Sequence, residues 1–337
     1  METYATREAY REELERRAVL PEGFMAGRTH IEFYPAERDM DKPLAMNLSL
    51  ILLDEPTPVF SGVFTRNQFP GTPVLIGRKR LSGARARGVL INNKIANVCV
   101  KTGEDDALSV LEALSRLVGS PVEEFFPCST GIIGFRLPVA EMTKALPALV
   151  SSLQSASIMP VSEGIMTTDA FPKVRSATVG KGRIVATAKG AGMIEPNMAT
   201  MLCFILTDID MKRDVIERSF RKAVSVSLNR ISVDSDQSTS DTALIFSSQR
   251  KPSVSEEEFT EALISVLSPL ASDIVRNGEG TTHVMKVLIE EAPDEVSAAG
   301  FAKAVVNSPL VKTAVFGNDP NVGRIISALG DYAGNSG

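Results

Sequence analysis

The sequence contains no tryptophan, only two histidines and only three cysteines among its 337 residues. The histidines, His30 and His283, lie far apart and belong to no ligand motif, so nothing local supports a zinc site or a histidine-based catalytic triad. The cysteines, Cys99, Cys128 and Cys203, are odd in number and lack metal-binding spacing. Two of them lie among apolar or small residues, which is typical of buried thiols. This pattern predicts a reducing compartment.

Long apolar runs and a strong charge of either sign are also missing. No run reaches the length needed to cross a bilayer, and residues 1–17 are a charged mixture rather than a signal or transit peptide. The 36 basic and 41 acidic residues are spread along the chain and give a net charge of −5. Such a distribution predicts neither a nucleic-acid partner nor a membrane-binding patch. We therefore expect a cytoplasmic protein whose ligand is a small metabolite.

The order of the expected elements favours an α+β fold. Short β-type runs separated by Pro, Gly and charged residues predict a mostly antiparallel sheet, with strands at 48–53, 59–65, 74–76 and 89–92. Residues 5–20 predict an exposed charged helix, and further helices are expected at 104–118, 139–153, 213–229 and 256–276, of which 104–118 and 139–153 show apolar residues along one face. Thr102 and Gly119 are expected to cap the second of these helices. Further strands are expected at 182–188, 202–207, 243–247 and 284–290. Because helices and strands come in blocks, layered sheets are favoured over a doubly wound parallel sheet.

Residues 189–203 carry the strongest functional signal, with the sequence KGAGMIEPNMATMLC. Ala199 and Thr200 place a small residue and a hydroxyl nucleophile between a glycine-rich turn and an apolar run typical of a buried strand. If the Thr200 hydroxyl attacks the Ala199 carbonyl, the peptide becomes an ester. Hydrolysis then leaves Thr200 as a new N-terminus whose free amine acts as its own general base. The dipeptide alone does not establish this chemistry, because threonine is also an ordinary strand residue.

Residues 189–202 resemble the self-cleavage motif of the ornithine acetyltransferase family, the bifunctional glutamate N-acetyltransferases of arginine biosynthesis. Further blocks resemble the family in the same order, so that the resemblance runs from about residue 21 to residue 330: 62–67, 129–134, 165–169, 238–242, 278–280 and 306–314. The resemblance implies a layered α+β sheet sandwich flanked by helices, of the N-terminal-nucleophile type. It also implies an α fragment, residues 1–199, and a β fragment, residues 200–337, which assemble as a heterotetramer of two α and two β fragments.

The resemblance assigns the catalytic roles. Thr200 would be the nucleophile, and Thr130 and Gly131 would form the oxyanion hole that acyl transfer requires. The tripeptide from Ser129 to Gly131 is expected to lie at a turn, and it fits an ordinary Ser/Thr-Gly turn equally well.

The resemblance also assigns substrate contacts. Lys189 would bind the α-carboxylate of an acetylated amino acid or lower the pKa of the Thr200 amine; a solvated surface lysine is the alternative. Thr167 matches a substrate contact and Thr168 is more suited to a structural role, although strand alternation leaves this choice open. Glu279, flanked by two glycines, matches a substrate-binding position, and its carboxylate is suited to an ammonium group.

Two polar or glycine-rich segments invite other interpretations. Asp234, Asp236 and Asp241 lack the Gly and the terminal Glu of a calcium-binding loop, so structural hydrogen bonds at the edge of the site are expected instead. Residues 190–192 lack the third glycine and the ribose-binding carboxylate of a dinucleotide fingerprint. We therefore expect no metal and no cofactor.

The expected reaction is transfer of acetyl from N-acetylornithine to glutamate through an acetyl-Thr200 ester. A variant in the family also uses acetyl-CoA, and the sequence does not decide between the two. An N-terminal-threonine aminopeptidase or amidohydrolase and a non-catalytic relative are the alternatives. Val322 stands where the family commonly has Trp, residues 92–99 depart from the family pattern, and the family C-terminal tail is expected to be missing. Self-cleavage should survive these departures better than acetyl transfer.

Overall fold

Two β-sheets form the centre of the molecule in the computed structural model, which describes residues 4–195 and 201–335. The four-stranded sheet has the order β1-β2-β4-β5, and the five-stranded sheet has the order β3-β9-β8-β7-β6. The strands are β1 (Phe24–Phe33), β2 (Leu44–Thr57), β3 (Phe60–Phe64), β4 (Ala86–Ile95), β5 (Phe125–Ile132), β6 (Lys173–Val179), β7 (Gly182–Lys189), β8 (Leu202–Ile209) and β9 (Thr242–Lys251). The β4–β5 and β8–β9 pairs are parallel and the other neighbours are antiparallel.

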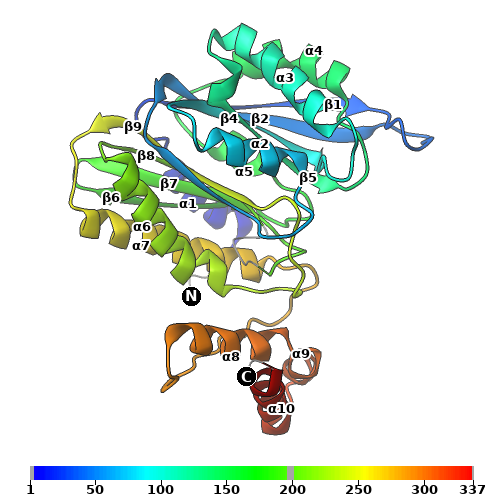
Figure 1. Ribbon diagram of the computed structural model, residues 1–337, viewed down its shortest axis with the longest axis vertical. Helices are drawn as coiled ribbons and strands as arrows, with labels where there is room; N and C mark the ends of the chain where they lie inside the picture. The colour runs from blue at the N-terminus through cyan, green and yellow to red at the C-terminus, as the bar shows by residue number, and fades with distance from the viewer. Residues whose placement is uncertain (1–3, 196–200, 336–337) are drawn as a thin grey trace.

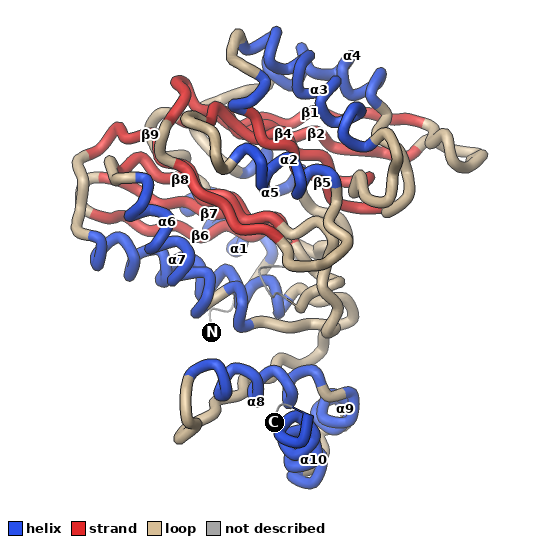
Figure 2. The backbone as a smooth tube through the Cα atoms, viewed as in Figure 1, coloured by secondary structure: helices blue, strands red, loops and turns tan. Residues whose placement is uncertain are grey.

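Helices cover the outer face of each sheet, as Figures 1 and 2 show. Helices α3 (Gly103–Val118) and α4 (Val139–Ser151) pack on the four-stranded sheet. Helices α6 (Arg213–Val226) and α7 (Glu256–Arg276) pack on the five-stranded sheet. The expected α+β sandwich of two sheets flanked by helices is therefore confirmed.

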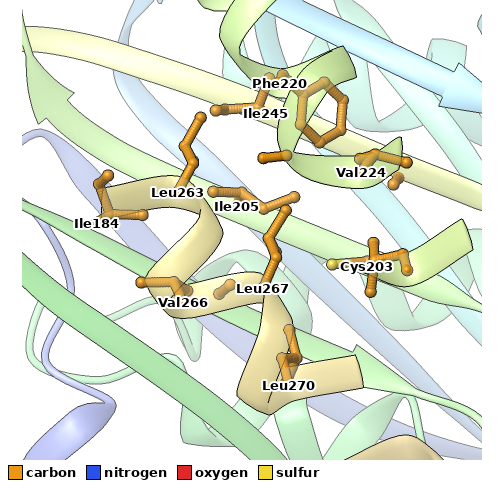
Figure 3. Packing of buried hydrophobic residues seen from close by; sticks show 14 of the residues in the cluster. Ile184, Cys203, Ile205, Phe220, Val224, Ile245, Leu263, Val266, Leu267 and Leu270 are labelled. Carbon is orange, nitrogen blue, oxygen red and sulfur yellow. The ribbon is translucent and has the colours of Figure 1, made fainter. Parts of the chain in front are cut away.

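The core beneath α6 and α7 is apolar on both sides. Figure 3 shows Phe220, Leu263 and Leu267 of the two helices facing Ile205 of β8 and Ile245 of β9. All five side chains are fully buried. Burial of an aliphatic or aromatic side chain of this size contributes about 1.5–3 kcal/mol, so this layer is a major source of stability.

A second apolar core lies between the sheets and contains three phenylalanine rings. Phe126 of β5 meets Phe60 of β3 at a centroid distance of 5.8 Å and Phe246 of β9 at 5.9 Å, both edge to face. Edge-to-face pairs are a favoured aromatic geometry at these distances. Phe126 belongs to one sheet and the other two rings belong to the second sheet. Their packing therefore fixes the position of one sheet relative to the other.

Three further helices lie against the two sheets, and three others lie beyond α7. The former are α1 (Arg7–Arg17), α2 (Thr72–Arg80) and α5 (Met159–Gly164); the latter are α8 (Glu295–Asn307), α9 (Pro309–Phe316) and α10 (Val322–Asn335). Figure 1 shows α8, α9 and α10 packed on one another beyond α7. Lys303 of α8 pairs with Glu195 at 3.0 Å, and the Lys312 ammonium of α9 donates to the Val233 carbonyl at 2.7 Å. Within the described residues, no helix has both the length and the apolar character that a membrane span requires.

Two expected strands are wrong. Residues 74–76 lie in α2, where Pro73 stands in the first turn; proline favours that position, and a short apolar run fits a buried helix as well as a strand. Residues 284–290 form irregular structure, although their burial alternates: Met285 and Val287 are partly buried, whereas Leu288 is exposed. Alternation reports which side chains face the protein, but a strand also needs a hydrogen-bonded neighbour.

The sheet expected over residues 45–93 is divided between the two observed sheets. β2 and β4 are neighbours in one sheet, whereas β3 pairs with β9 in the other. Side-chain patterns identify a strand but leave its partner open, which explains the error. Gly119 ends α3 with φ of +73° as expected. Thr102 precedes α3, but its hydroxyl donates to the Asp106 carboxylate at 2.7 Å instead of capping a backbone amide.

Candidate active site

The candidate site lies where the ends of three strands meet. Lys189 is the last residue of β7 and is the partner of Leu202, the first residue of β8. The Lys189 ammonium donates to the Thr130 hydroxyl on β5 at 3.0 Å. Since β5 belongs to the four-stranded sheet and β7 to the five-stranded sheet, this contact joins the two sheets at the edge of the site.

Thr130 and Gly131 lie within β5 and not at the expected turn. They face Asn93 and Lys94 of the parallel strand β4. Gly131 has φ of +129°, and a Cβ atom there would lie 2.2 Å from the Lys94 carbonyl oxygen, so only glycine fits. The turn was expected because Ser, Thr and Gly favour turns, but the buried residues before them continue the strand to this point.

Lys189 is half-buried and hydrogen-bonded to Thr130, so it is not a solvated surface lysine. Desolvation is the main influence on its ammonium and lowers its pKa. Asp169 opposes this shift, as do Asp241 and Glu279, whereas Lys173 adds to it. A cation with a lowered pKa beside a hydroxyl can bind a carboxylate or stabilise a developing oxyanion.

Glu279 lies beside the turn that follows β7. Its carboxylate accepts from the Thr168 hydroxyl at 2.6 Å, and its backbone N–H donates to the Ala191 carbonyl at 2.8 Å. A Cβ atom on Gly192 would lie 2.7 Å from the Glu279 carboxylate, so glycine permits this approach. Lys189 therefore directly precedes the turn formed by residues 190–192, and Glu279 contacts that turn.

Thr167 and Thr168 lie in a loop rather than in the strand that their alternation suggested. Both are exposed. The Thr168 hydroxyl is bonded to Glu279, whereas among the described residues the Thr167 hydroxyl makes no hydrogen bond and only its backbone N–H is engaged. Alternation failed here because the loop is held by hydrogen bonds to side chains distant in the sequence.

Sequence reasoning missed a buried ion pair in the same loop. Lys173 and Asp169 are in contact at 2.6 Å, and both side chains have 0% exposure. The Asp169 carboxylate also accepts from the backbone N–H groups of Gly190 at 2.8 Å and Thr167 at 3.0 Å. Asp169 stands in one of the segments that resembles the family, but its neighbours in the sequence do not indicate that it is buried.

Burial and ion pairing shift the pKa of Asp169, and that of Lys173, in opposite directions. Burial raises the pKa of the Asp169 carboxyl, but Lys173, Lys189 and the hydrogen bonds outweigh it, so this pKa lies below its usual value. Burial lowers the pKa of Lys173, and Asp169 offsets only part of that shift. The carboxylate is therefore the well-stabilised member of the pair.

Of the aspartates at positions 234, 236 and 241, Asp234 binds the backbone that follows the turn of residues 190–192. The Asp234 carboxylate accepts from the backbone N–H groups of Met193 at 2.5 Å and Ile194 at 2.6 Å, which is the structural role expected for this patch. Asp241 is buried, and Asp236 is exposed. Across the described ranges, no three His, Cys, Asp or Glu side chains gather as metal ligands do.

The proposed cleavage site, Ala199 and Thr200, lies outside the described residues. The described chain resumes at Met201, whose carbonyl accepts from the Thr242 backbone N–H at 2.9 Å. Thr200 thus precedes β8 by two positions in the sequence, and β8 begins beside Lys189.

Comparison with known proteins decides the family. The model of the ArgJ family matches residues 36–336. The chain belongs to the ArgJ family. It is 40% identical over 314 residues to the arginine biosynthesis bifunctional protein ArgJ of Geobacter sulfurreducens, covering 90% of this chain and 79% of that protein. It is also 40% identical over 271 residues to glutamate N-acetyltransferase Oat2 of Streptomyces clavuligerus, covering 80% of this chain and 69% of that protein.

A solved structure also resembles this ArgJ-family chain. The crystal structure of ornithine acetyltransferase complexed with ornithine from Mycobacterium tuberculosis is 27% identical, with a TM-score of 0.43, and the match covers 55% of this chain and 97% of that one. Membership of the ArgJ family rests on the sequence matches alone, and these confirm the resemblance found in the motifs.

Proposed function

We propose that this ArgJ-family protein transfers acetyl from N-acetylornithine to glutamate through an acetyl ester on Thr200. The single observation that carries the proposal is the contact between Lys189 and Thr130 at the edge where β8 begins. It brings a cation and a hydroxyl donor to the strand end that Thr200 precedes in the sequence. A nucleophile there would act beside two groups suited to an acyl-transfer intermediate.

The reaction has two symmetrical halves. The Thr200 amine takes the proton of its own hydroxyl, and Oγ attacks the acetyl carbonyl of N-acetylornithine. The oxyanion accepts hydrogen bonds from Thr130 and from the Gly131 backbone N–H. Ornithine leaves as the amine after it receives the proton, and the glutamate amine then attacks the acetyl-Thr200 ester and regenerates the threonine.

Charge complementarity supports the assignment of the substrate contacts. An N-acetylated ornithine carries an α-carboxylate and a distant ammonium group. In our proposal Lys189 binds the carboxylate and Glu279 binds the ammonium, while Thr167 supplies a further polar contact. Lys189 directly precedes the turn of residues 190–192 and Glu279 is hydrogen-bonded to that turn at Ala191, so the two charged groups both lie next to one turn.

We further propose that the chain cleaves itself between Ala199 and Thr200, giving fragments 1–199 and 200–337. The five-stranded sheet supports a stable assembly of the two, because β3, β6 and β7 precede the cut whereas β8 and β9 follow it. A heterotetramer of two α and two β fragments, a cytoplasmic location and the use of acetyl-CoA as a second donor belong to the same proposal.

The function is tested by incubating purified protein with N-acetylornithine and glutamate and measuring N-acetylglutamate and ornithine. We expect the two products in equal amounts, and none from the Thr200→Ala variant. Release of acetate without N-acetylglutamate would identify an amidohydrolase in which water replaces glutamate. No product from either protein would identify a non-catalytic relative.

A further inference from the structure

The Asp169 carboxylate connects three segments that are far apart in the sequence. It is eight-percent exposed as a residue and its side chain is fully enclosed. Its hydrogen-bond donors come from its own loop, from the turn after β7 and from the end of α7. Each of these segments carries one of the proposed substrate contacts, namely Thr167, Lys189 and Glu279.

The two carboxylate oxygens have different partners. Oδ1 accepts from the Gly190 N–H at 2.8 Å and from the Lys173 ammonium at 2.6 Å. Oδ2 accepts from the Thr167 N–H at 3.0 Å. Thus one oxygen holds the turn that follows Lys189, and the other holds the residue proposed to contact substrate.

Asn277 extends the connection to the segment before Glu279. Its side-chain amide donates to Asp169 Oδ1 at 3.5 Å, and its side-chain carbonyl accepts from the Ala170 N–H at 3.0 Å. Asn277 directly follows α7 and is itself buried. The loop of residues 165–170 is therefore bound at two adjacent positions to the residue that follows α7.

Lys173 makes a buried carboxylate tolerable at this junction. Its ammonium contacts Asp169 Oδ1, lies 3.4 Å from the Phe171 carbonyl oxygen and stands 5.3 Å from the centroid of the Phe171 ring. A buried charge persists where it is paired and hydrogen-bonded, and both members of this pair meet that condition. Lys173 contacts none of the proposed substrate-binding groups directly among the described residues.

We propose that Asp169 is a positioning residue that fixes the relative places of Thr167, Lys189 and Glu279, and that Lys173 supplies its neutralising charge. The inference rests on the proposed function for the identity of the substrate contacts. Among the described residues, Asp169 hydrogen-bonds to the segments that carry these three side chains and not to the side chains themselves, and its charge also raises the pKa of Lys189. Small displacements of binding groups lower turnover strongly, so a loss of this junction should affect catalysis more than it affects folding.

An isosteric substitution separates shape from hydrogen bonding. Asparagine has the shape of aspartate but a single acceptor oxygen, so Asp169→Asn cannot accept from both Thr167 and Gly190. Combined with Lys173→Met, it removes both members of the buried ion pair. The matched control is Arg175→Met with Asp273→Asn, which removes the neighbouring buried pair that joins β6 to α7 at 2.7 Å.

The experiment compares the matured wild type with the two double variants by thermal melting, steady-state kinetics and calorimetric titration with ornithine. We expect Asp169→Asn/Lys173→Met to lower kcat/KM roughly 10-fold to 100-fold and to weaken ornithine binding. We expect the control pair to lower the melting temperature without changing either quantity more than about twofold. Equal kcat/KM and ornithine affinity in wild type and Asp169→Asn/Lys173→Met would overturn the positioning role.

Further outcomes of this experiment separate the role of Asp169 from the proposed function. If the double variant does not fold, Asn277→Ala removes only uncharged contacts to the same loop; a raised KM supports the role and an unchanged KM overturns it. If the wild type binds ornithine but transfers no acetyl, the proposed function fails, and the ornithine affinities still decide the role of Asp169. If the wild type neither binds ornithine nor transfers acetyl, both proposals fail.

Discussion

The Lys189 ammonium donates a hydrogen bond to the Thr130 hydroxyl at 3.0 Å, although 59 positions separate the two residues in the sequence. The contact joins the last residue of β7 to β5 of the opposite sheet. It places a desolvated cation beside one of the two proposed oxyanion donors. We therefore expect both residues to act mainly on catalysis and only modestly on stability.

Removal of the Thr130 hydroxyl should affect the transition state. We expect Thr130→Ala to lower kcat by roughly 100-fold with little change in KM, because oxyanion donors act on charge that develops during the reaction. Steady-state kinetics with varied N-acetylornithine measures both constants. A raised KM with an unchanged kcat would instead assign Thr130 to substrate binding.

Lys189→Met should separate activity from stability. Because desolvation holds the pKa of Lys189 below the ordinary lysine value, the folded state binds this proton less well than the unfolded state. The wild type therefore gains stability as pH rises from the folded pKa to the unfolded one, and the variant lacks this gain. We expect the variant to melt no lower than wild type at neutral pH and to lose at least about tenfold in kcat/KM.

Thermal melting across the neutral to alkaline range, together with kinetics at one pH, checks this prediction. The difference in melting temperature between variant and wild type should shrink as pH rises. A large drop in the variant's melting temperature at neutral pH would show that Lys189 stabilises the fold, and it would contradict a net cost of burying its charge.

The Glu279→Gln substitution separates the effect of the negative charge of Glu279 from that of its hydrogen bond with Thr168. Glutamine can still accept from the Thr168 hydroxyl, so the loop contact is retained while the negative charge is lost. We expect the KM for N-acetylornithine to rise by about tenfold, since a hydrogen bond to a charged group is worth about 1.5–3 kcal/mol. Thr168→Val is the matched control, because it breaks the contact and keeps the charge. An equal rise in KM in both variants would assign the effect to the loop contact.

The two fragments should remain associated after cleavage. β7 and β8 pair from Ile184 with Thr207 to Lys189 with Leu202, and they lie on opposite sides of the proposed cut. We expect denaturing mass spectrometry to detect a fragment that begins at Thr200, and native mass spectrometry to detect both fragments together. Thr200→Ala should stay full length. A wild type that remains one intact chain after prolonged incubation contradicts the maturation step.

Much of the fold follows from local patterns in the sequence. Helix α7 has the bounds predicted from the sequence, residues 256–276, and Ser255 caps its start by accepting from the Glu258 N–H at 3.1 Å. Residues 74–76 were misassigned because three apolar residues satisfy more than one periodicity. The observed layers agree with the α+β arrangement because helices and strands alternate only in blocks.

The site was predictable only in part. The family motifs indicated Thr130 and Lys189, and the structure brings these two together. The role of Asp169 was not predictable, because its donors Gly190 and Asn277 lie 21 and 108 positions away and their approach depends on the folded sheets. Long-range hydrogen bonds of this kind leave no local pattern in one sequence.

The central claim is the acetyl ester on Thr200, and one measurement tests it directly. Matured protein is incubated with N-acetylornithine in the absence of glutamate, quenched in acid, and its fragments are mapped by mass spectrometry. We expect one added acetyl group on the fragment that begins at Thr200, located on that threonine and lost when glutamate is added. An acetyl group on Lys189 or on a cysteine, or no acetyl group on either fragment of an active enzyme, would contradict it.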